Sequence, residues 1–208
     1  MTTPSSVSSP VGAGELFERR VAPLRDLAEQ AGDVARTCHA MARRFHRGGT
    51  LVVFGNGGPS TDAQHVAVEF VHPVIVGKRA LPAVSLTADV ATVTGVANRV
   101  GLTEIFAHQI RLLAAPADIA LGLSATGDCA NVVRGLEEAR GLGMLTVALL
   151  GGDGGRIAAS GLADHVLVAA TTDPRVIKEV HVTMYHVLWE LVHVFFEQPG
   201  VLDPGVVR

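Results

Sequence analysis

A histidine and a glutamate, His65 and Glu69, stand four residues apart in a segment whose pattern predicts a helix. Residues with this spacing share one helix face, so the imidazole and the carboxylate can lie side by side. Such a pair suits the transfer of a proton between neighbouring carbon atoms, with the carboxylate as base and an acid or metal ion stabilising the oxyanion that forms. An isolated pair of this kind is more often a solvated pair on a helix surface, so its meaning depends on its surroundings.

A second group of titratable residues lies on the long final helix that the periodicity predicts. Its members follow one another at intervals of seven, four and three residues, which places them in one stripe along the helix. They are Glu179, His186, Glu190 and His193. The stripe is either a second set of chemical groups or the partly solvated face of an amphipathic helix. His181 lies off the stripe, which favours a place in a core or an interface.

Two glycine-containing loops could hold an anion. Each is predicted to follow a buried strand and to lead into a helix, where glycine lets the backbone approach a ligand and hydroxyl and N–H groups can face it. The candidate binding residues are Asn56, Gly57, Gly58 and Ser60 in the first loop and Ser124, Thr126, Gly127 and Cys129 in the second. Neither loop has the spacing of a Walker loop or of a dinucleotide-binding loop. Each could also be an ordinary turn between a strand and a helix.

The elements that would position these groups alternate along the chain. Short apolar runs predict strands at 51–54, 83–86, 118–123, 144–150 and 165–169. Helical patterns occupy 61–71, 90–98, 103–114, 130–142 and 175–197. The alternation predicts an α/β fold, a three-layer αβα sandwich around a doubly wound, mainly parallel five-stranded sheet. In such a sheet ligands bind at the carboxyl ends of the strands.

The chain divides into four predicted parts. Residues 1–14 form a disordered tail, 15–48 an N-terminal helical arm, 49–198 the α/β domain and 199–208 a C-terminal tail. A break in the arm is expected near residues 31–33, and the glycine-rich segment 151–155 is expected to be a tight turn.

Composition narrows the classes of function. Of the 208 residues, 48% are hydrophobic and 18% charged, which is enough for a sizeable core. The net charge of -3 and the 4% of aromatic residues give no reason to expect a nucleic acid or an acidic membrane as partner. The first residues lack the pattern of a signal peptide, and no apolar run is long enough to span a membrane. With two cysteines outside any CxxC pair, Cys38 and Cys129, we expect a cytoplasmic protein with reduced thiols.

Several of these motifs occur together in the order and spacing of one known family. The segments GNGGPSTDAQHVAVEF, LPAVSLTAD, GLSATGDCANVV, GMLTVALLGGDGG and VIKEVHVTMYH resemble phosphoheptose isomerases, and the resemblance runs from about Phe17 to Glu197. It implies the sugar isomerase (SIS) fold and a homotetramer with sites at subunit interfaces. The implied reaction converts sedoheptulose 7-phosphate to D-glycero-D-manno-heptose 7-phosphate, or isomerises a related sugar phosphate, through an enediol and without a redox cofactor.

The resemblance also implies roles for single residues. The positions of Glu69 and His186 are the acid–base pair of the family, and those of His65, Glu69, Lys178 and His186 surround a zinc ion. The family has glutamine where this chain has Lys178, and a protonated lysine has no lone pair to give to a metal. Zinc at His65, Glu69 and His186 is therefore an expectation with a stated objection.

Two arrangements of Lys178 are open from the sequence. Its ammonium group can take the place of the metal and bind the substrate or the oxyanion, or the side chain can turn to solvent and leave a weak metal site. The chain has only two lysines against fifteen arginines, so we expect this lysine to have a function. Pro59, Ala125 and Cys129 also depart from the residues of the family, and these changes leave a phosphate site while changing its hydroxyl groups.

Three functions remain open from the sequence. The first is the isomerase, which the joint presence of His65, Glu69 and His186 favours. The second is a non-catalytic SIS protein that binds a sugar phosphate or regulates a partner, like the initiator-associating protein of bacterial replication, and the departures listed above favour it. The third is a lyase or etherase that acts on an amino-sugar phosphate.

Overall fold

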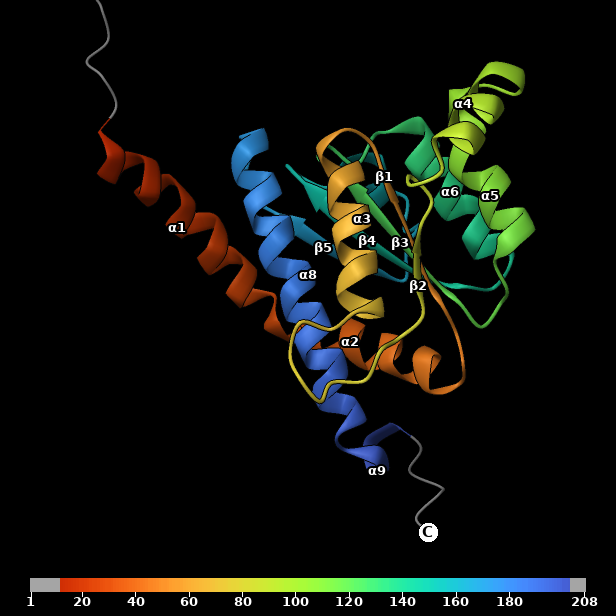
Figure 1. Cartoon of the computed structure of the whole chain (residues 1–208). Helices are drawn as coiled ribbons and strands as arrows, with labels where there is room; N and C mark the ends of the chain where they lie inside the picture. Colours follow the sequence, from red (N-terminus) through yellow and green to blue (C-terminus); the bar gives the residue numbers. More distant parts are fainter. Residues whose placement is uncertain (1–11, 203–208) are drawn as a thin grey trace, which may run out of the picture.

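Five parallel strands form the centre of the computed structural model, which describes residues 12–202 (Figure 1). The strands are β1 (Leu51–Gly55), β2 (Ala83–Ser85), β3 (Ile119–Ser124), β4 (Leu145–Gly151) and β5 (His165–Ala169). Their order in the sheet is β2-β1-β3-β4-β5, and each neighbouring pair is parallel. The predicted α/β fold class is confirmed.

Helices cover both faces of the sheet. One face carries α1 (Ala13–Glu29), α2 (Ala31–His46), α3 (Gly58–Val71) and α8 (Pro174–Phe196). The other carries α4 (Val90–Arg99), the 3-10 turn η1 (Leu102–Glu104), α5 (Ile105–Leu113), α6 (Ala130–Gly141) and α7 (Gly155–Ala159). A short helix, α9 (Pro199–Leu202), follows α8.

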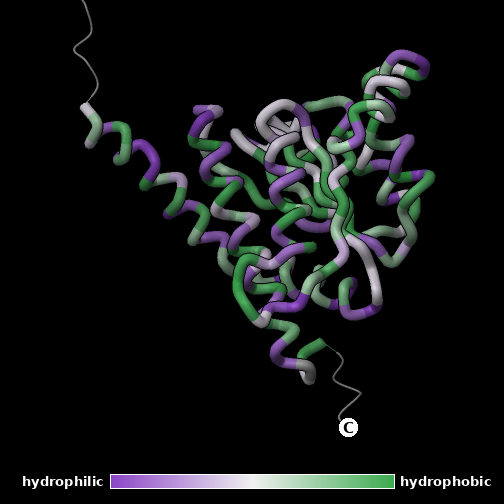
Figure 2. The backbone as a smooth tube through the Cα atoms, in the orientation of Figure 1, coloured by the Kyte–Doolittle hydropathy of each residue, from purple (hydrophilic) through white to green (hydrophobic). Residues whose placement is uncertain are grey.

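The core lies in two layers, one on each side of the sheet. Successive strand residues alternate between them, so Leu51 and Val53 pack with α2, α3 and α8 while Val52 and Phe54 pack with α5 and α6. Every residue of β1, β3 and β4 is buried, which explains why these strands are continuous apolar runs in the sequence (Figure 2).

The winding of the sheet reverses between β1 and β3. The chain leaves β1 through α3 to reach β2 on one side, and it leaves β3 through α6 to reach β4 on the other. The loops that follow β1 and β3 therefore diverge from a common crevice at the carboxyl ends of the strands, which is where ligands bind in sheets of this kind.

Some element boundaries differ from the sequence predictions. Helix α3 begins at Gly58 rather than at residue 61, with Pro59 in its first turn, where a missing N–H costs nothing. The glycine segment after β4 does turn sharply, with positive φ angles at Gly152 and Gly154, but it leads into the unpredicted helix α7.

The ends of the chain also differ. Helix α1 starts at Ala13, inside the predicted tail, and the arm breaks at Gln30, one residue before the expected break. Residues 199–202 of the predicted C-terminal tail form α9; residues 1–11 and 203–208 lie outside the described residues.

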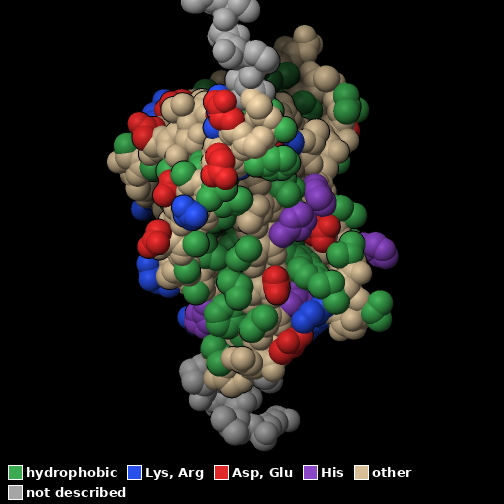
Figure 3. Space-filling model, turned by 90° about the vertical axis from the view of Figure 1, so that its left-hand side faces the viewer, with side chains coloured by type: hydrophobic (Ala, Val, Ile, Leu, Met, Phe, Trp, Pro, Cys, Tyr) green, Lys and Arg blue, Asp and Glu red, His purple; other side chains and the backbone are tan. Residues whose placement is uncertain are grey.

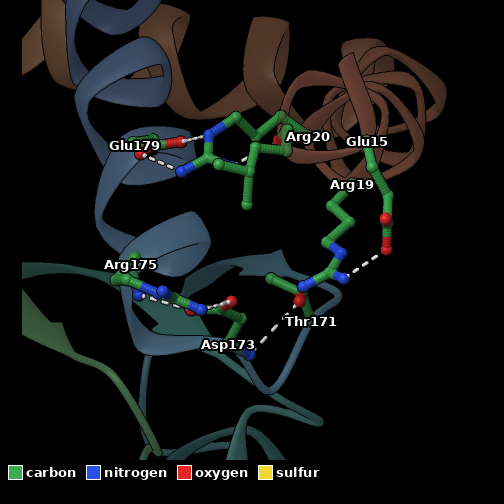
Figure 4. A network of polar contacts seen from close by, with 8 residues as sticks. Glu15, Arg19, Arg20, Thr171, Asp173, Arg175 and Glu179 are labelled. Carbon is green, nitrogen blue, oxygen red and sulfur yellow. Dashed lines mark hydrogen bonds and ion pairs between the residues drawn. The ribbon is translucent and has the colours of Figure 1, made fainter. Parts of the chain in front are cut away.

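The arm is fastened to the domain by polar contacts. The side chain of Gln30 donates to the carbonyl oxygen of Val168 at 2.8 Å and accepts from its N–H at 3.1 Å, so one amide pairs with the free edge of β5 as a further strand would. Arg20 makes a two-point contact with Glu179 of α8, at 2.6 and 3.0 Å (Figure 4). Within the described residues, no helix is long and apolar enough to cross a membrane.

Candidate active site

Helices α3 and α8 bring three chemical groups together on one face of the sheet. His65 and Glu69 come from α3 and His186 comes from α8, and one donor atom of each lies within 4.8 Å of the others. His65 Nε2 is 3.1 Å from Glu69 Oε1. The Glu69 side chain is 11% exposed and that of His65 44% exposed, so the carboxylate lies at the bottom of the group and the imidazole at its mouth.

Two aromatic residues of α8 hold this group in place, and neither was singled out from the sequence. The Tyr185 hydroxyl lies 3.0 Å from His65 Nδ1, and the Trp189 indole N–H donates to the backbone carbonyl of Glu69 at 2.9 Å. Tyr185 is fully buried, and burial raises its pKa above the ordinary value, with smaller contributions from the nearby carboxylates of Asp62 and Glu69. The available signal was that a buried tyrosine or tryptophan usually needs a partner for its polar atom.

The three groups fit a zinc ion. Two imidazoles and one carboxylate, with a fourth position left for substrate or water, form a donor set that catalytic zinc sites use. Tyr185 would then orient His65 from the far side of its ring, because the nitrogen that is not needed as ligand lies on the hydroxyl group. The arrangement is thus compatible with a metal and also with metal-free proton transfer.

Lys178 adopts neither of the two arrangements that the sequence left open. Its ammonium group lies 2.6 Å from Asp62 Oδ1 and donates also to Thr61 Oγ1, at 3.1 Å, and to the Gly58 carbonyl, at 3.3 Å. The Asp62 side chain is 4% exposed, so the lysine compensates a buried charge. The electrostatic objection to a metal at His65, Glu69 and His186 is therefore weaker than the sequence suggests.

The two glycine loops are joined by a pair of amides. Asn56 donates to Asn131 Oδ1 at 2.6 Å, and Asn131 donates back to Asn56 Oδ1 at 2.9 Å. Asn131, in the first turn of α6, is 5% exposed and was also not identified from the sequence. The pair fixes the loop after β1 relative to the loop after β3.

Glycine is required in both loops. Gly57 has φ +62° at the entry to α3, and Gly127 has φ +74° with a hypothetical Cβ only 1.9 Å from the Gly154 carbonyl oxygen. The same region holds Gly58 in the first turn of α3, 3.7 Å from the Lys178 side chain by the same measure.

The hydroxyl groups of the second loop have different roles. Ser124 is buried, and its Oγ accepts from the Gly127 N–H at 3.0 Å and donates to Cys129 Sγ at 3.4 Å. Thr126 is exposed, and Cys129 precedes α6 without capping it through its side chain. The N–H groups of the first turn of α6 therefore remain for a ligand, and Ser124 shapes the loop.

Cavities adjoin this loop. One of about 670 Å³ is lined by Thr126, Asp128 and Thr171 among others, and one of about 270 Å³ lies between the two loops and α8. Ser60, the last candidate of the first loop, lies in α3 and accepts through its carbonyl from Thr87 Oγ1 at 3.2 Å.

The remaining members of the predicted stripe on α8 separate from the site. His193 is buried and its ring nitrogens lie 2.8 Å from the Trp189 carbonyl and 2.9 Å from the Arg79 carbonyl. Glu179 pairs with Arg20 and Glu190 is exposed. Of the stripe, only His186 joins the chemical group.

Comparison with known proteins agrees with this geometry. Residues 17–151 match the model of the SIS domain. The phosphoheptose isomerase of Desulfovibrio desulfuricans is 40% identical over 179 residues, which cover 85% of this chain and 84% of the relative. That of Aquifex aeolicus is 37% identical over 178 residues, covering 86% and 91%. The chain belongs to the phosphoheptose isomerase family.

Solved structures of this family have the same fold. The phosphoheptose isomerase of Francisella tularensis superimposes with a TM-score of 0.79 at 32% identity, over 86% of this chain and 95% of that one. The enzyme of Neisseria gonorrhoeae gives the same TM-score and coverage at 27% identity. Membership in the family thus rests on sequence and structure together.

Proposed function

We propose that this protein is an aldose–ketose isomerase that converts sedoheptulose 7-phosphate, or a related sugar phosphate, to the corresponding aldose phosphate. The observation that carries the proposal is the convergence of His65, Glu69 and His186 next to two loops suited to an anion. The family relationship adds the class of substrate, because the curated relatives are phosphoheptose isomerases.

The reaction moves one proton between neighbouring carbon atoms. Glu69 removes a proton from the carbon beside the ketose carbonyl, and His186 delivers a proton to the carbonyl oxygen, which gives an enediol. The first hydroxyl of the enediol then returns its proton to His186 while Glu69 donates the stored proton to the other carbon, and the aldose results. Both groups end in their starting state, as a catalyst requires.

We further propose that zinc binds at His65, Glu69 and His186. A metal here would stabilise negative charge on the substrate oxygens as a Lewis acid. In that state Glu69 supplies a carboxylate close to the reacting carbons, and Tyr185 keeps the His65 ring oriented through Nδ1. Lys178 leaves the group free of an extra positive charge because it pairs with Asp62.

The phosphate is proposed to bind at the residues after β3. The first-turn N–H groups of α6 carry the positive end of the helix dipole, and Thr126 offers a hydroxyl group. Asn56, Gly57, Gly58 and Ser60 would bound the sugar from the other loop, and the Asn56–Asn131 amide pair holds the two loops together.

We propose a homotetramer whose arms pack between subunits. Helix α1 leaves Phe17 72% exposed and Leu16 and Leu24 each 40% exposed, and apolar side chains spread over the face that α1 and α8 form (Figure 3). Such a face favours contact with a second copy of the chain. Two unpaired cysteines favour a reducing, cytoplasmic location.

Replacement of Glu69 tests the enzyme proposal. Glu69→Gln preserves shape but removes the base, so we expect isomerisation of sedoheptulose 7-phosphate and exchange of substrate hydrogen with solvent to fall by about 10²-fold or more. Glu137→Gln, on the exposed surface of α6, is the control. Unchanged turnover in Glu69→Gln would refute its role as base. A wild-type protein that binds sugar phosphates without any exchange would favour the non-catalytic alternative.

A further inference from the structure

Beneath the first loop lies a small polar chamber that the reaction described above does not use. We call it the Asp62 chamber; it has a volume of about 270 Å³ and is lined in part by Asn56, Gly58, Asp62, Ala125, Lys178 and His181. Its volume is below the roughly 300–1,000 Å³ of sites that hold a whole small ligand. Since one water occupies about 30 Å³ of liquid, the chamber has room for several waters or for a short part of a ligand.

Two buried side chains of this chamber have polar atoms without partners. His181 is 1% exposed and Asp62 is 3% exposed. Among residues 12–202, neither ring nitrogen of His181 and no group at Asp62 Oδ2 completes a hydrogen bond. A buried polar atom without a partner is costly, and such atoms are rare in folded proteins. The arrangement therefore points to a polar group that enters the chamber.

The chemistry of the lining selects the kind of group. The ammonium group of Lys178 already serves three acceptors, Asp62 Oδ1, Thr61 Oγ1 and the Gly58 carbonyl, so its N–H groups are used. Asp62 Oδ2 accepts a hydrogen bond. Burial lowers the pKa of His181, which favours the neutral ring with one N–H to donate. A hydroxyl group matches both, because it donates to the carboxylate and accepts from the ring.

The position of the chamber agrees with this chemistry. It touches Ala125 of the proposed phosphate loop at one end. On α3, Asp62 lies one turn before His65, and on α8, Lys178 and His181 precede His186 by two turns and about one turn. The chamber thus lies between the place proposed for the phosphate and the acid–base group, along the path of the carbon chain that joins them.

We propose that the Asp62 chamber is a hydroxyl-binding subsite in which Asp62 and His181 recognise a hydroxyl group in the middle of the sugar chain. The subsite rests on the proposed function, because it assigns part of the same substrate. It makes Asp62 and His181 specificity residues: a sugar phosphate that lacks this hydroxyl leaves both groups unpaired. Sites that hydrogen-bond a substrate hydroxyl reject the analogue without it far more strongly than apolar pockets do.

The test compares sugar phosphates that differ by one hydroxyl group. For the wild-type protein, kcat/KM and the calorimetric Kd are measured with sedoheptulose 7-phosphate and with analogues deoxygenated at each carbon between the carbonyl and the phosphate. We expect one deoxy position to lose about 10- to 100-fold, the range for a hydrogen bond to a charged group. Asp62→Asn and His181→Asn should reduce that preference to within about threefold, with Glu137→Gln as the unaffected control.

Asp62→Asn removes one partner of a buried ion pair and can destabilise the fold. The double variant Asp62→Asn/Lys178→Gln removes both charges and serves as the second measurement, with thermal unfolding recorded for each protein. It should lose the same preference as Asp62→Asn.

The outcomes separate the subsite from the isomerase. Turnover with a hydroxyl preference that both single variants and the double variant retain overturns the subsite and leaves the isomerase. Binding that loses its preference in the variants, without turnover in the wild type, overturns the isomerase and supports the subsite. A wild type that neither binds nor converts any of these sugar phosphates overturns both.

Discussion

Removal of the Lys178 side-chain charge should expose the cost of a buried carboxylate. In Lys178→Met the Asp62 carboxylate, whose side chain is 4% exposed, loses a partner at 2.6 Å. Breaking one partner of a fully buried pair costs about 3–5 kcal/mol. The lysine side chain is 43% exposed, so water screens this pair in part, and we expect a loss of about 2–3 kcal/mol. For a chain of this length that is a decrease in Tm of about 5–10 °C.

The other lysine of the chain is the matched control. Lys78 pairs with Glu197, whose side chain is 59% exposed, so Lys78→Met should cost less than about 1 kcal/mol. Thermal and urea unfolding, followed by circular dichroism at constant protein concentration, measure both variants. The double variant Asp62→Asn/Lys178→Met should recover most of the lost stability. Equal losses for the two lysine variants, or a double variant as unstable as the sum of the single ones, would refute the reasoning.

Three other expectations follow from the same contacts. Tyr185→Phe removes the hydrogen bond to His65 but keeps the ring, so zinc affinity should fall about 10- to 100-fold in a chelator competition; unchanged affinity would mean that Tyr185 has no part in holding the ligand. Because burial lowers the pKa of His181, the unfolded chain binds more protons below about pH 6.5, and the unfolding free energy should fall there by up to ~1.4 kcal/mol per pH unit. Urea titrations at about pH 5 and pH 7 should show a smaller difference for His181→Asn than for the wild type. Light scattering should give a tetramer at micromolar concentration, and Phe17→Glu should shift it to smaller species; a monomeric wild type would contradict the proposed arm contacts.

The fold was predictable because the strands are buried on both sides. A strand covered by helices on each face has no polar residue to interrupt it, so β1 and β4 stand out as apolar runs. Helix α7 was missed because its five residues, Gly155–Ala159, are too short for a periodic pattern. The start of α3 was placed late because Gly58 and Pro59 read as loop residues, although proline is common in a first helical turn.

The site was predictable only where its spacing is local. His65 and Glu69 belong to one helix, so their common face follows from the interval of four. The place of Lys178 could not be derived in this way, since Asp62 lies 116 residues away and only the packing of α3 on α8 brings the two together. The same holds for Tyr185, whose partner His65 is 120 residues distant.

Helices α3 and α8 are joined by polar contacts at three successive levels. Asp62 binds Lys178, His65 binds Tyr185, and the Glu69 carbonyl binds Trp189, with sequence separations of 116, 120 and 120 residues. A nearly constant separation means that the two helices run in the same direction with matched turns. Each level therefore fixes the register for the next, and the middle and last levels hold the two α3 members of the acid–base group.

This register connects the departure at Lys178 to the chemistry. A lysine that pointed at His65 and Glu69 would compete with a metal for the carboxylate. Because Asp62 lies one helical turn earlier on α3, it draws the ammonium group to the first level, away from the level of the imidazole. The position can thus carry a positive charge while the three donors at His65, Glu69 and His186 stay together, so the change at residue 178 alters the neighbouring chamber more than it alters the acid–base group.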